Sequence, residues 1–216
     1  MASSATGAQP TELPVSELDF AAAQQELELI RVQDPWLLAE LRSDHAGETG
    51  AVWIYKGAYQ AMQLRPLPPA VGEFVSHHLK TEQGHLAYFD ALLSHREQSR
   101  LTSLWVIAGF GLGFIPTLLG PKALYATIHA VETYVEQHYN NHIRRLEARG
   151  ASNPYPKLTT ALKQFCCDEV EHAVDAGDRY GFRKLEAELQ KPSLARAWSW
   201  VVAQGSAAAV EVAKRV

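Results

Sequence analysis

The stretch Glu82-Gln83-Gly84-His85 (EQGH) decides the fold, because the same pair of residue types returns in Glu169-Val170-Glu171-His172 (EVEH). A single glutamate precedes each pair at a similar distance, Glu48 before the first and Glu132 before the second. Residues three apart lie on one face of an α-helix, so each pair can present both side chains to one site. The chain therefore carries the order Glu, then Glu-x-x-His, twice.

Helix signals surround these residues. Asp34 and Pro35 are typical of a helix start, and the breaker RPLPP at 65–69 ends that helix. Further breakers give helices over about 70–96, 121–150 and 157–177, and an alanine-rich helix after Pro192. Sustained alternation of polar and apolar residues, typical of strands, is missing from the sequence. We therefore predict an all-α four-helix bundle with a long connection between its second and third helices and an extra C-terminal helix.

Each of the four long helices has an apolar stripe that a glutamate interrupts. A buried carboxylate without a partner is costly, and four together would raise one another's pKa values. Two divalent cations would balance the four negative charges, and a mixed carboxylate and imidazole set suits iron or manganese. The pattern predicts a di-metal centre with these candidate ligands: Glu48, Glu82, His85, Glu132, Glu169 and His172. The alternative is a metal-free core in which these side chains bond to one another.

The connection between the second and third helices contains an uncharged segment, LTSLWVIAGFGLGFIPTLLGP at 101–121. Its length just suffices for a transmembrane helix, but its glycines and Pro116 argue against an ordinary span. Two interpretations stay open. The segment is either a buried crossover helix or an apolar surface that dips into one membrane leaflet or borders the opening for a lipophilic substrate.

Composition narrows the class of protein. The 216 residues carry 20 basic and 24 acidic side chains, a net charge of −4, and no basic cluster, so nucleic acid is not an expected partner. Two adjacent cysteines exclude a disulfide framework. Residues 1–30 are expected to be a loose tail and a weak helix, and residues 31–216 the domain. The acidic N-terminal stretch lacks the features of a signal or transit peptide, which favours a bacterial cytoplasm.

Several motifs together resemble one family. They are LRSDHAGETGA at 41–51 with IYKG at 54–57, EQGHL at 82–86, AVE at 130–132 with HYNNHI at 138–143, and DEVEH at 168–172. They resemble the demethoxyubiquinone hydroxylases, the di-iron monooxygenases of ubiquinone biosynthesis in the ferritin-like superfamily. The apolar, glycine-rich connection is similar too, and the resemblance covers roughly 35–216. Thr49, Val52-Trp53 and Cys166-Cys167 depart from the family pattern outside the six ligand positions.

The resemblance implies a ferritin-like bundle in which the six candidate ligands hold two iron ions, with Glu82 and Glu169 as the bridging residues. The implied reaction is O2-dependent hydroxylation of a demethoxylated quinone ring on a polyprenyl tail, with electrons ultimately from NADH. It also implies a peripheral location on the cytoplasmic face of the bacterial inner membrane, or on the matrix face in a mitochondrion. A lipid-presenting partner protein and a homo-oligomer stay open. The alternative function is another ferritin-like di-iron oxygenase or a ferroxidase with a non-quinone substrate.

Other polar residues near the candidate ligands have two interpretations each. His138 and Tyr139 are candidate catalytic residues of a proton or electron relay, which the resemblance favours, or ordinary core residues. Asp44 and Asp175 could orient ligand histidines, although a solvated helix face is the preferred interpretation of Asp44. His78 is expected to be a core histidine with a hydrogen-bond partner.

Overall fold

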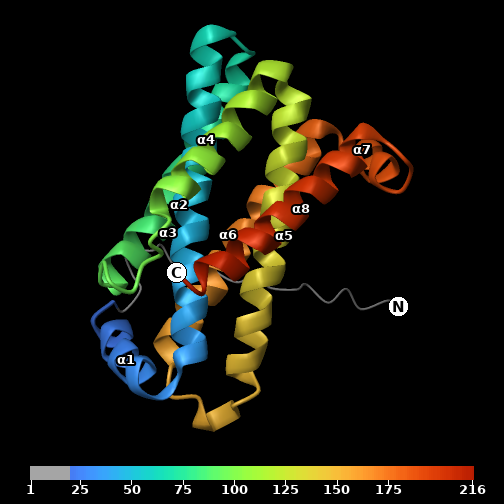
Figure 1. The fold of residues 1–216 in the computed structure, drawn as a ribbon. Helices are drawn as coiled ribbons and strands as arrows, with labels where there is room; N and C mark the ends of the chain where they lie inside the picture. The colour runs from blue at the N-terminus through green and yellow to red at the C-terminus, as the bar shows by residue number, and fades with distance from the viewer. Residues whose placement is uncertain (1–19) are drawn as a thin grey trace, which may run out of the picture.

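The computed structural model describes residues 20–216, and all of its regular elements there are helical (Figure 1). In chain order the elements are α1 (Phe20–Gln33), α2 (Pro35–Leu64), α3 (Pro69–Leu92), α4 (Thr102–Leu119), α5 (Pro121–Glu147), the short 3-10 helix η2 (Gly150–Ser152), α6 (Pro156–Tyr180), α7 (Phe182–Leu189) and α8 (Leu194–Ala213). The predicted all-α class is confirmed.

Helix boundaries follow the local chemistry. The side chain of Asp34 accepts a hydrogen bond from the backbone N–H of Leu37 at 3.2 Å and so caps α2. The helix predicted to reach about Arg96 ends instead at Leu92, because the Glu97 carboxylate accepts hydrogen bonds from the backbone and hydroxyl of Ser94 and stabilises a turn there. The predictions also lacked α7, a helix of only 8 residues.

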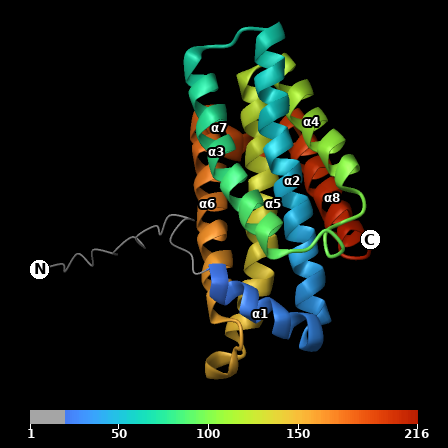
Figure 2. The same ribbon diagram turned by 90° about the vertical axis from the view of Figure 1, so that its left-hand side faces the viewer.

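Four long helices, α2, α3, α5 and α6, form the bundle, and α4 is the crossover that joins its two halves (Figures 1 and 2). The short connection over residues 65–68 makes α2 and α3 antiparallel neighbours, and the turn around η2 does the same for α5 and α6. Helix α4 packs along α2, α8 packs against α5, and α1 lies across one end of the bundle. This is the ferritin-like arrangement that was predicted.

Glycines bring α4 unusually close to α2. A Cβ atom added at Gly113 would lie 1.8 Å from the carbonyl oxygen of Ile54, and one at Gly109 would lie 2.2 Å from that of Gly50. The same is true in reverse at Gly57 on α2, where a Cβ would lie 2.3 Å from the oxygen of Phe110. Only glycine permits such an approach of two backbones. Two of the glycines that argued against an ordinary membrane span, Gly109 and Gly113, are therefore helix-packing positions.

Helix α4 is a crossover helix that is buried on one face only, so it is not the fully buried helix of the first interpretation, and the membrane interpretation stays a prediction. Its face toward α2 is buried, while Leu104, Ile107, Ile115 and Leu119 on its outer face are 48–74% exposed. Within residues 20–216 it is the one helix long and apolar enough to cross a membrane, judged by length and composition alone. The crossover thus packs on the bundle and leaves an apolar face uncovered.

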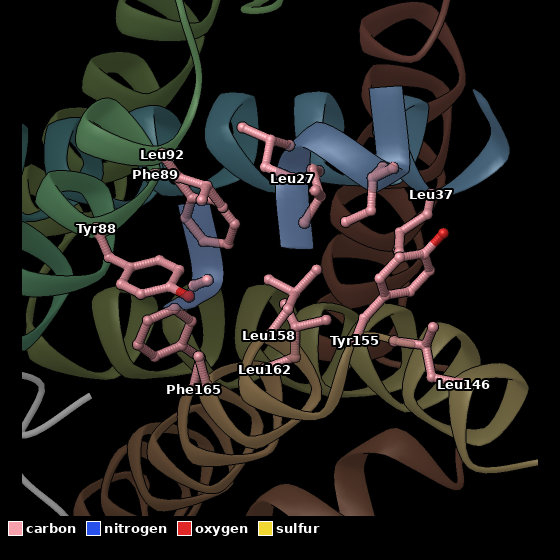
Figure 3. Close-up of a cluster of buried hydrophobic side chains, with 14 of the residues drawn as sticks. Leu27, Leu37, Tyr88, Phe89, Leu92, Leu146, Tyr155, Leu158, Leu162 and Phe165 are labelled. Atoms are coloured by element: carbon pink, nitrogen blue, oxygen red, sulfur yellow. The ribbon is translucent and has the colours of Figure 1, made fainter. Parts of the chain in front are cut away.

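The largest core cluster joins α1 to the bundle. Figure 3 shows Leu27 of α1 and Leu37 of α2 beside side chains of α3, α5 and α6, among them Phe89 and Phe165. Ala23, Leu27 and Ile30 are all buried, so the residues of α1 belong to the same core as the bundle. The proposed domain boundary at residue 31 stays a prediction, but it does not separate two cores. The part of the expected 1–30 segment that precedes Phe20 lies outside the described residues.

Candidate di-metal centre

The four bundle helices bring the six candidate ligands to one buried place. Helix α2 carries Glu48, α3 carries Glu82 and His85, α5 carries Glu132, and α6 carries Glu169 and His172. None of the six is more than 3% exposed. Because the Glu-x-x-His spacing places both residues of a pair on one helix face, a pair from α3 and a pair from α6 meet across the core.

The ligand atoms form two groups that share two glutamates. Within each group the atoms lie within 4.8 Å of one another. One group consists of Glu48, Glu82, His85 and Glu169, and the other of Glu82, Glu132, Glu169 and His172. The His172 Nδ1 atom lies 2.8 Å from Glu82 Oε1, and the His85 Nδ1 atom lies 3.2 Å from Glu169 Oε1. Glu82 and Glu169 therefore stand between the two histidines.

Many polar atoms of this centre have no hydrogen-bond partner. They include both carboxylate oxygens of Glu82 and of Glu169, one oxygen each of Glu48 and Glu132, and Nδ1 of His85 and His172. Such atoms are rare in protein cores, because a buried polar group without a partner loses its hydrogen bonds to water and gains none from the protein. Each of the six candidate ligands contributes at least one such atom.

Without a bound cation, the charges and the burial at this centre favour the protonated forms of Glu48 and Glu132. Burial raises the pKa of the Glu48 carboxyl to about 8, and the negative charges of Glu169 and Glu82 add to the effect. Burial and the same two charges raise the pKa of Glu132 well above its usual range. The protein thus holds acidic groups where their charged forms need compensation.

Hydrogen bonds from neighbouring side chains hold three of the candidate ligands in position. His85 Nε2 lies 2.9 Å from Asp168 Oδ2, an interaction that orients the imidazole so that Nδ1 points into the centre. The Tyr55 hydroxyl donates to Glu132 at 3.2 Å, and the Tyr139 hydroxyl donates to Glu48. Asp168 was missed by the sequence reasoning, although its place one residue before Glu169 was a usable signal.

The structure also shows where the other polar residues singled out in the sequence lie. The preferred interpretation of Asp44 as solvated is wrong: its side chain is 0% exposed and lies 3.2 Å from His138 Nε2. Asp175 lies 2.9 Å from Nε2 of His78, and not beside a candidate ligand histidine, because His78 occupies the space next to His172. His78 is thus a buried histidine with a hydrogen-bond partner, as expected. The contacts of His138 are with a separate cluster on α2, whereas Tyr139 contacts Glu48.

A cavity of about 430 Å³ ends on the carboxylates of this centre. Glu48, Glu82, Glu132 and Glu169 line its inner end, and apolar or small residues of α2, α4, α5 and α8 line the rest. Among these are Leu112 on α4 and Ala209 on α8. Figure 2 shows α4 and α8 on the same side of the bundle. The cavity therefore connects the buried acids with the side of the molecule that carries exposed apolar residues.

A ferritin-like bundle with two buried Glu and Glu-x-x-His sets defines the class of di-metal carboxylate proteins. The family model described as ubiquinone biosynthesis protein COQ7 matches residues 36–213, and the chain belongs to this family. A relative from Dictyostelium discoideum, named NADPH-dependent 3-demethoxyubiquinone 3-hydroxylase, mitochondrial, is 32% identical over 82% of this chain and 76% of its own length.

Two more relatives carry similar names. A Rhodospirillum rubrum protein named 3-demethoxyubiquinol 3-hydroxylase is 37% identical over 68% of this chain and 66% of its own length. A Rattus norvegicus protein with the same name as the Dictyostelium one is 36% identical over 61% of this chain and 59% of its own length. The chain thus belongs to a family of ubiquinone-biosynthesis enzymes whose named members are hydroxylases, that is, monooxygenases.

Proposed function

We propose that this protein is an O2-dependent di-iron monooxygenase that hydroxylates the demethoxylated ring of a polyprenyl quinone. The observation that carries the proposal is the apolar cavity that ends on four buried glutamates. This shape suits a lipophilic substrate with one reactive ring. The apolar walls of the cavity would bind the lipid tail, and the end lined by glutamates would lie next to the reactive ring. Family membership supports the ring as the substrate class.

Six residues would hold the iron ions: Glu48, Glu82, His85, Glu132, Glu169 and His172. Their orphan buried atoms support this assignment, because two divalent ions would satisfy those atoms and balance the four carboxylates. The two ligand groups have Glu82 and Glu169 in common, which supports these two as bridges. Bound iron would supply the reductive activation of O2, which no side chain can perform.

The side chains of the protein would position the reactants, exclude water and move protons. Tyr139 donates its hydroxyl hydrogen to Glu48, so this phenol stands where it can hold or pass a proton at the centre. Burial, together with the negative charge of Glu48, raises the pKa of Tyr139 well above its usual range, which keeps the phenol protonated. We therefore assign the relay to Tyr139. The role predicted for His138 in the same relay stays a prediction.

We further propose that the α4 and α8 side of the molecule rests on a membrane surface. Ile107 and Leu119 on α4 and Trp200 on α8 are 65–74% exposed and lie on helices that line the cavity. Such a face would place the opening of the cavity against the lipid in which a polyprenyl quinone dissolves. The bacterial cytoplasmic face and the mitochondrial matrix face both fit this arrangement, as do a lipid-presenting partner and a homo-oligomer.

The reductant is proposed to be a nicotinamide that binds transiently. The resemblance implies NADH, whereas the Dictyostelium and rat relatives carry NADPH-dependent in their names. Steady-state turnover of the iron-loaded protein with each nucleotide in turn will decide between the two.

The proposed function is tested in a strain that lacks its own hydroxylase. Mass spectrometry of extracted quinones should show the demethoxylated precursor in that strain and the hydroxylated product after this gene is supplied. Glu82→Ala should remove the product, while the exposed Glu171→Ala should not. If the wild-type protein accumulates, binds two iron ions and still leaves the precursor unchanged, the quinone substrate is wrong. A ferroxidase would instead oxidise added Fe²⁺ and sediment as a large shell.

The membrane proposal has its own test with phospholipid vesicles. Ile107→Glu should reduce cosedimentation with the vesicles, because it places a charge on the exposed face of α4. Val174→Glu is the matched control, since Val174 is 51% exposed on α6. Equal loss of binding in both variants, or in neither, would contradict the assignment of this face.

A further inference from the structure

A second buried cluster of metal-binding residue types lies between α2 and α5. Glu40 and Asp44 stand one turn apart on α2, and His138 and His142 stand one turn apart on α5. The side chains of Glu40, Asp44 and His142 are at most 8% exposed, and that of His138 is 11% exposed. This cluster shares no residue with the six candidate iron ligands.

The donor atoms have the separations that a bound ion requires. Glu40 Oε2 lies 3.7 Å from His142 Nδ1 and 3.8 Å from His138 Nε2, and all three donors fall within 4.8 Å of one another. A tetrahedral ion of the zinc type, with bonds of about 2.0–2.2 Å, separates its ligand atoms by about 3.3–3.6 Å. Two of the three donor separations are thus within about half an ångström of the tetrahedral value, and the third is at most 4.8 Å.

Several of the buried atoms lack hydrogen-bond partners. These are Glu40 Oε2, His142 Nε2 and both carboxylate oxygens of Asp44. Asp44 Oδ1 lies 3.6 Å from His142 Nε2, on the side of the ring away from Glu40. A metal-bound histidine commonly has a carboxylate at its second nitrogen, which fixes the ring and its tautomer. Asp44 lies on that side of the His142 ring, and a shift of about half an ångström would close the 3.6 Å separation to a hydrogen bond.

The charge of the cluster also calls for a cation. Two carboxylates face one ammonium group, that of Lys214 at the end of α8, which leaves one negative charge uncompensated when both imidazoles are neutral. Lys214 Nζ lies 2.9 Å from Glu40 Oε2, yet that oxygen accepts no well-aligned hydrogen bond. The Lys214 side chain is 21% exposed, so it can turn into water when another cation takes its place.

We propose that Glu40, His138 and His142 bind one divalent transition-metal ion of the zinc type, with water as the fourth ligand. Asp44 would accept a hydrogen bond from His142 Nε2 once the ion is bound, and the ammonium of Lys214 competes with the ion for Glu40. Two imidazoles and one carboxylate with an open fourth position are the ligand set of many protein zinc sites. This inference concerns a site apart from the candidate iron centre and does not depend on the proposed reaction.

The test counts and locates ions in the intact chain. Metal-free protein is dialysed against Zn²⁺, the bound ions are counted by mass spectrometry, and crystals are measured at the zinc absorption edge. The wild-type chain should bind one ion more than His142→Gln, and the lost ion should be the anomalous peak between α2 and α5. His77→Ala, an exposed histidine on α3, is the control and should retain every ion.

Lys214→Met makes the test decisive. If the ammonium competes with the ion, its removal should tighten Zn²⁺ binding at this site about tenfold or more. A metal-free network, in which His138 donates to Ser43 or Asp44, predicts instead that Lys214→Met binds no extra ion and is only less stable. Absence of the peak from both wild-type and Lys214→Met crystals, or its persistence in a folded His142→Gln variant, would overturn the proposal.

Discussion

Removal of the metal should make the stability of this protein strongly dependent on pH. In the folded, metal-free chain the pKa of Glu48 is raised from 4.5 to about 8, chiefly because burial penalises its charged form. Between those two values the folded state holds a proton that the unfolded state has lost. The stability that this proton contributes is complete below pH 4.5 and is lost as the pH rises to about 8.

The size of the effect follows from the same shift. One pKa unit corresponds to about 1.4 kcal/mol, so the rise of Glu48 alone lowers the free energy of unfolding by about 5 kcal/mol across the window. Glu132, whose pKa burial also raises, acts with the same sign. Glu169 has a lowered pKa, so its contribution changes below pH 4.5 and does not oppose the trend. Bound divalent ions replace these protons, so the loaded protein should lack most of the dependence.

Urea unfolding at pH 5, 6, 7 and 8, with chelator and with iron, measures the effect. The apo protein should lose stability at each step, and the difference between loaded and apo protein should grow. Glu48→Gln should make the apo protein more stable than wild-type apo protein at pH 8, although it weakens metal binding. Glu171→Gln, at an exposed position on α6, should change neither. Apo stability that stays level or rises from pH 5 to 8 would refute the buried-carboxylate reasoning.

Three further perturbations address the supports of the centre. Asp168→Asn should weaken metal binding by about 10–100-fold in a competition titration, because it removes the carboxylate that orients His85; equal affinity would contradict that role. Gly113→Ala should lower the free energy of unfolding by about 3 kcal/mol because its Cβ would collide with the backbone of α2, whereas Gly111→Ala, which meets nothing within 4 Å, should be neutral or stabilising. Ala209→Trp should fill the cavity and reduce kcat/KM for the quinone with unchanged iron content; full activity would show that substrate uses another path.

The sequence was sufficient to predict the bundle, since helix periodicity, proline breakers and the repeated Glu-x-x-His order are all local signals. It also indicated which glutamates interrupt the apolar stripes. The structure brings those residues into one buried place because each of the four helices turns its stripe inward.

Features that depend on pairs of distant residues were beyond the sequence. Nothing near Asp44 signals that α5 covers it with His138 and His142, and so its burial was not foreseen. Likewise, Gly109 and Gly113 have no recognisable purpose until α2 lies against them. The end of α3 depends on a contact of Glu97 with the local turn and with Arg31 on α1, which periodicity does not register.

The two Glu and Glu-x-x-His sets lie on two separate helical hairpins, α2 with α3 and α5 with α6, that only the α4 crossover connects. Each ligand group draws donors from both hairpins, so neither hairpin alone can assemble a complete coordination sphere. A pair of ions bound there would cross-link the two hairpins. The complete site would then form only after the two hairpins have packed together. Loss of the ions would weaken the interface between these hairpins.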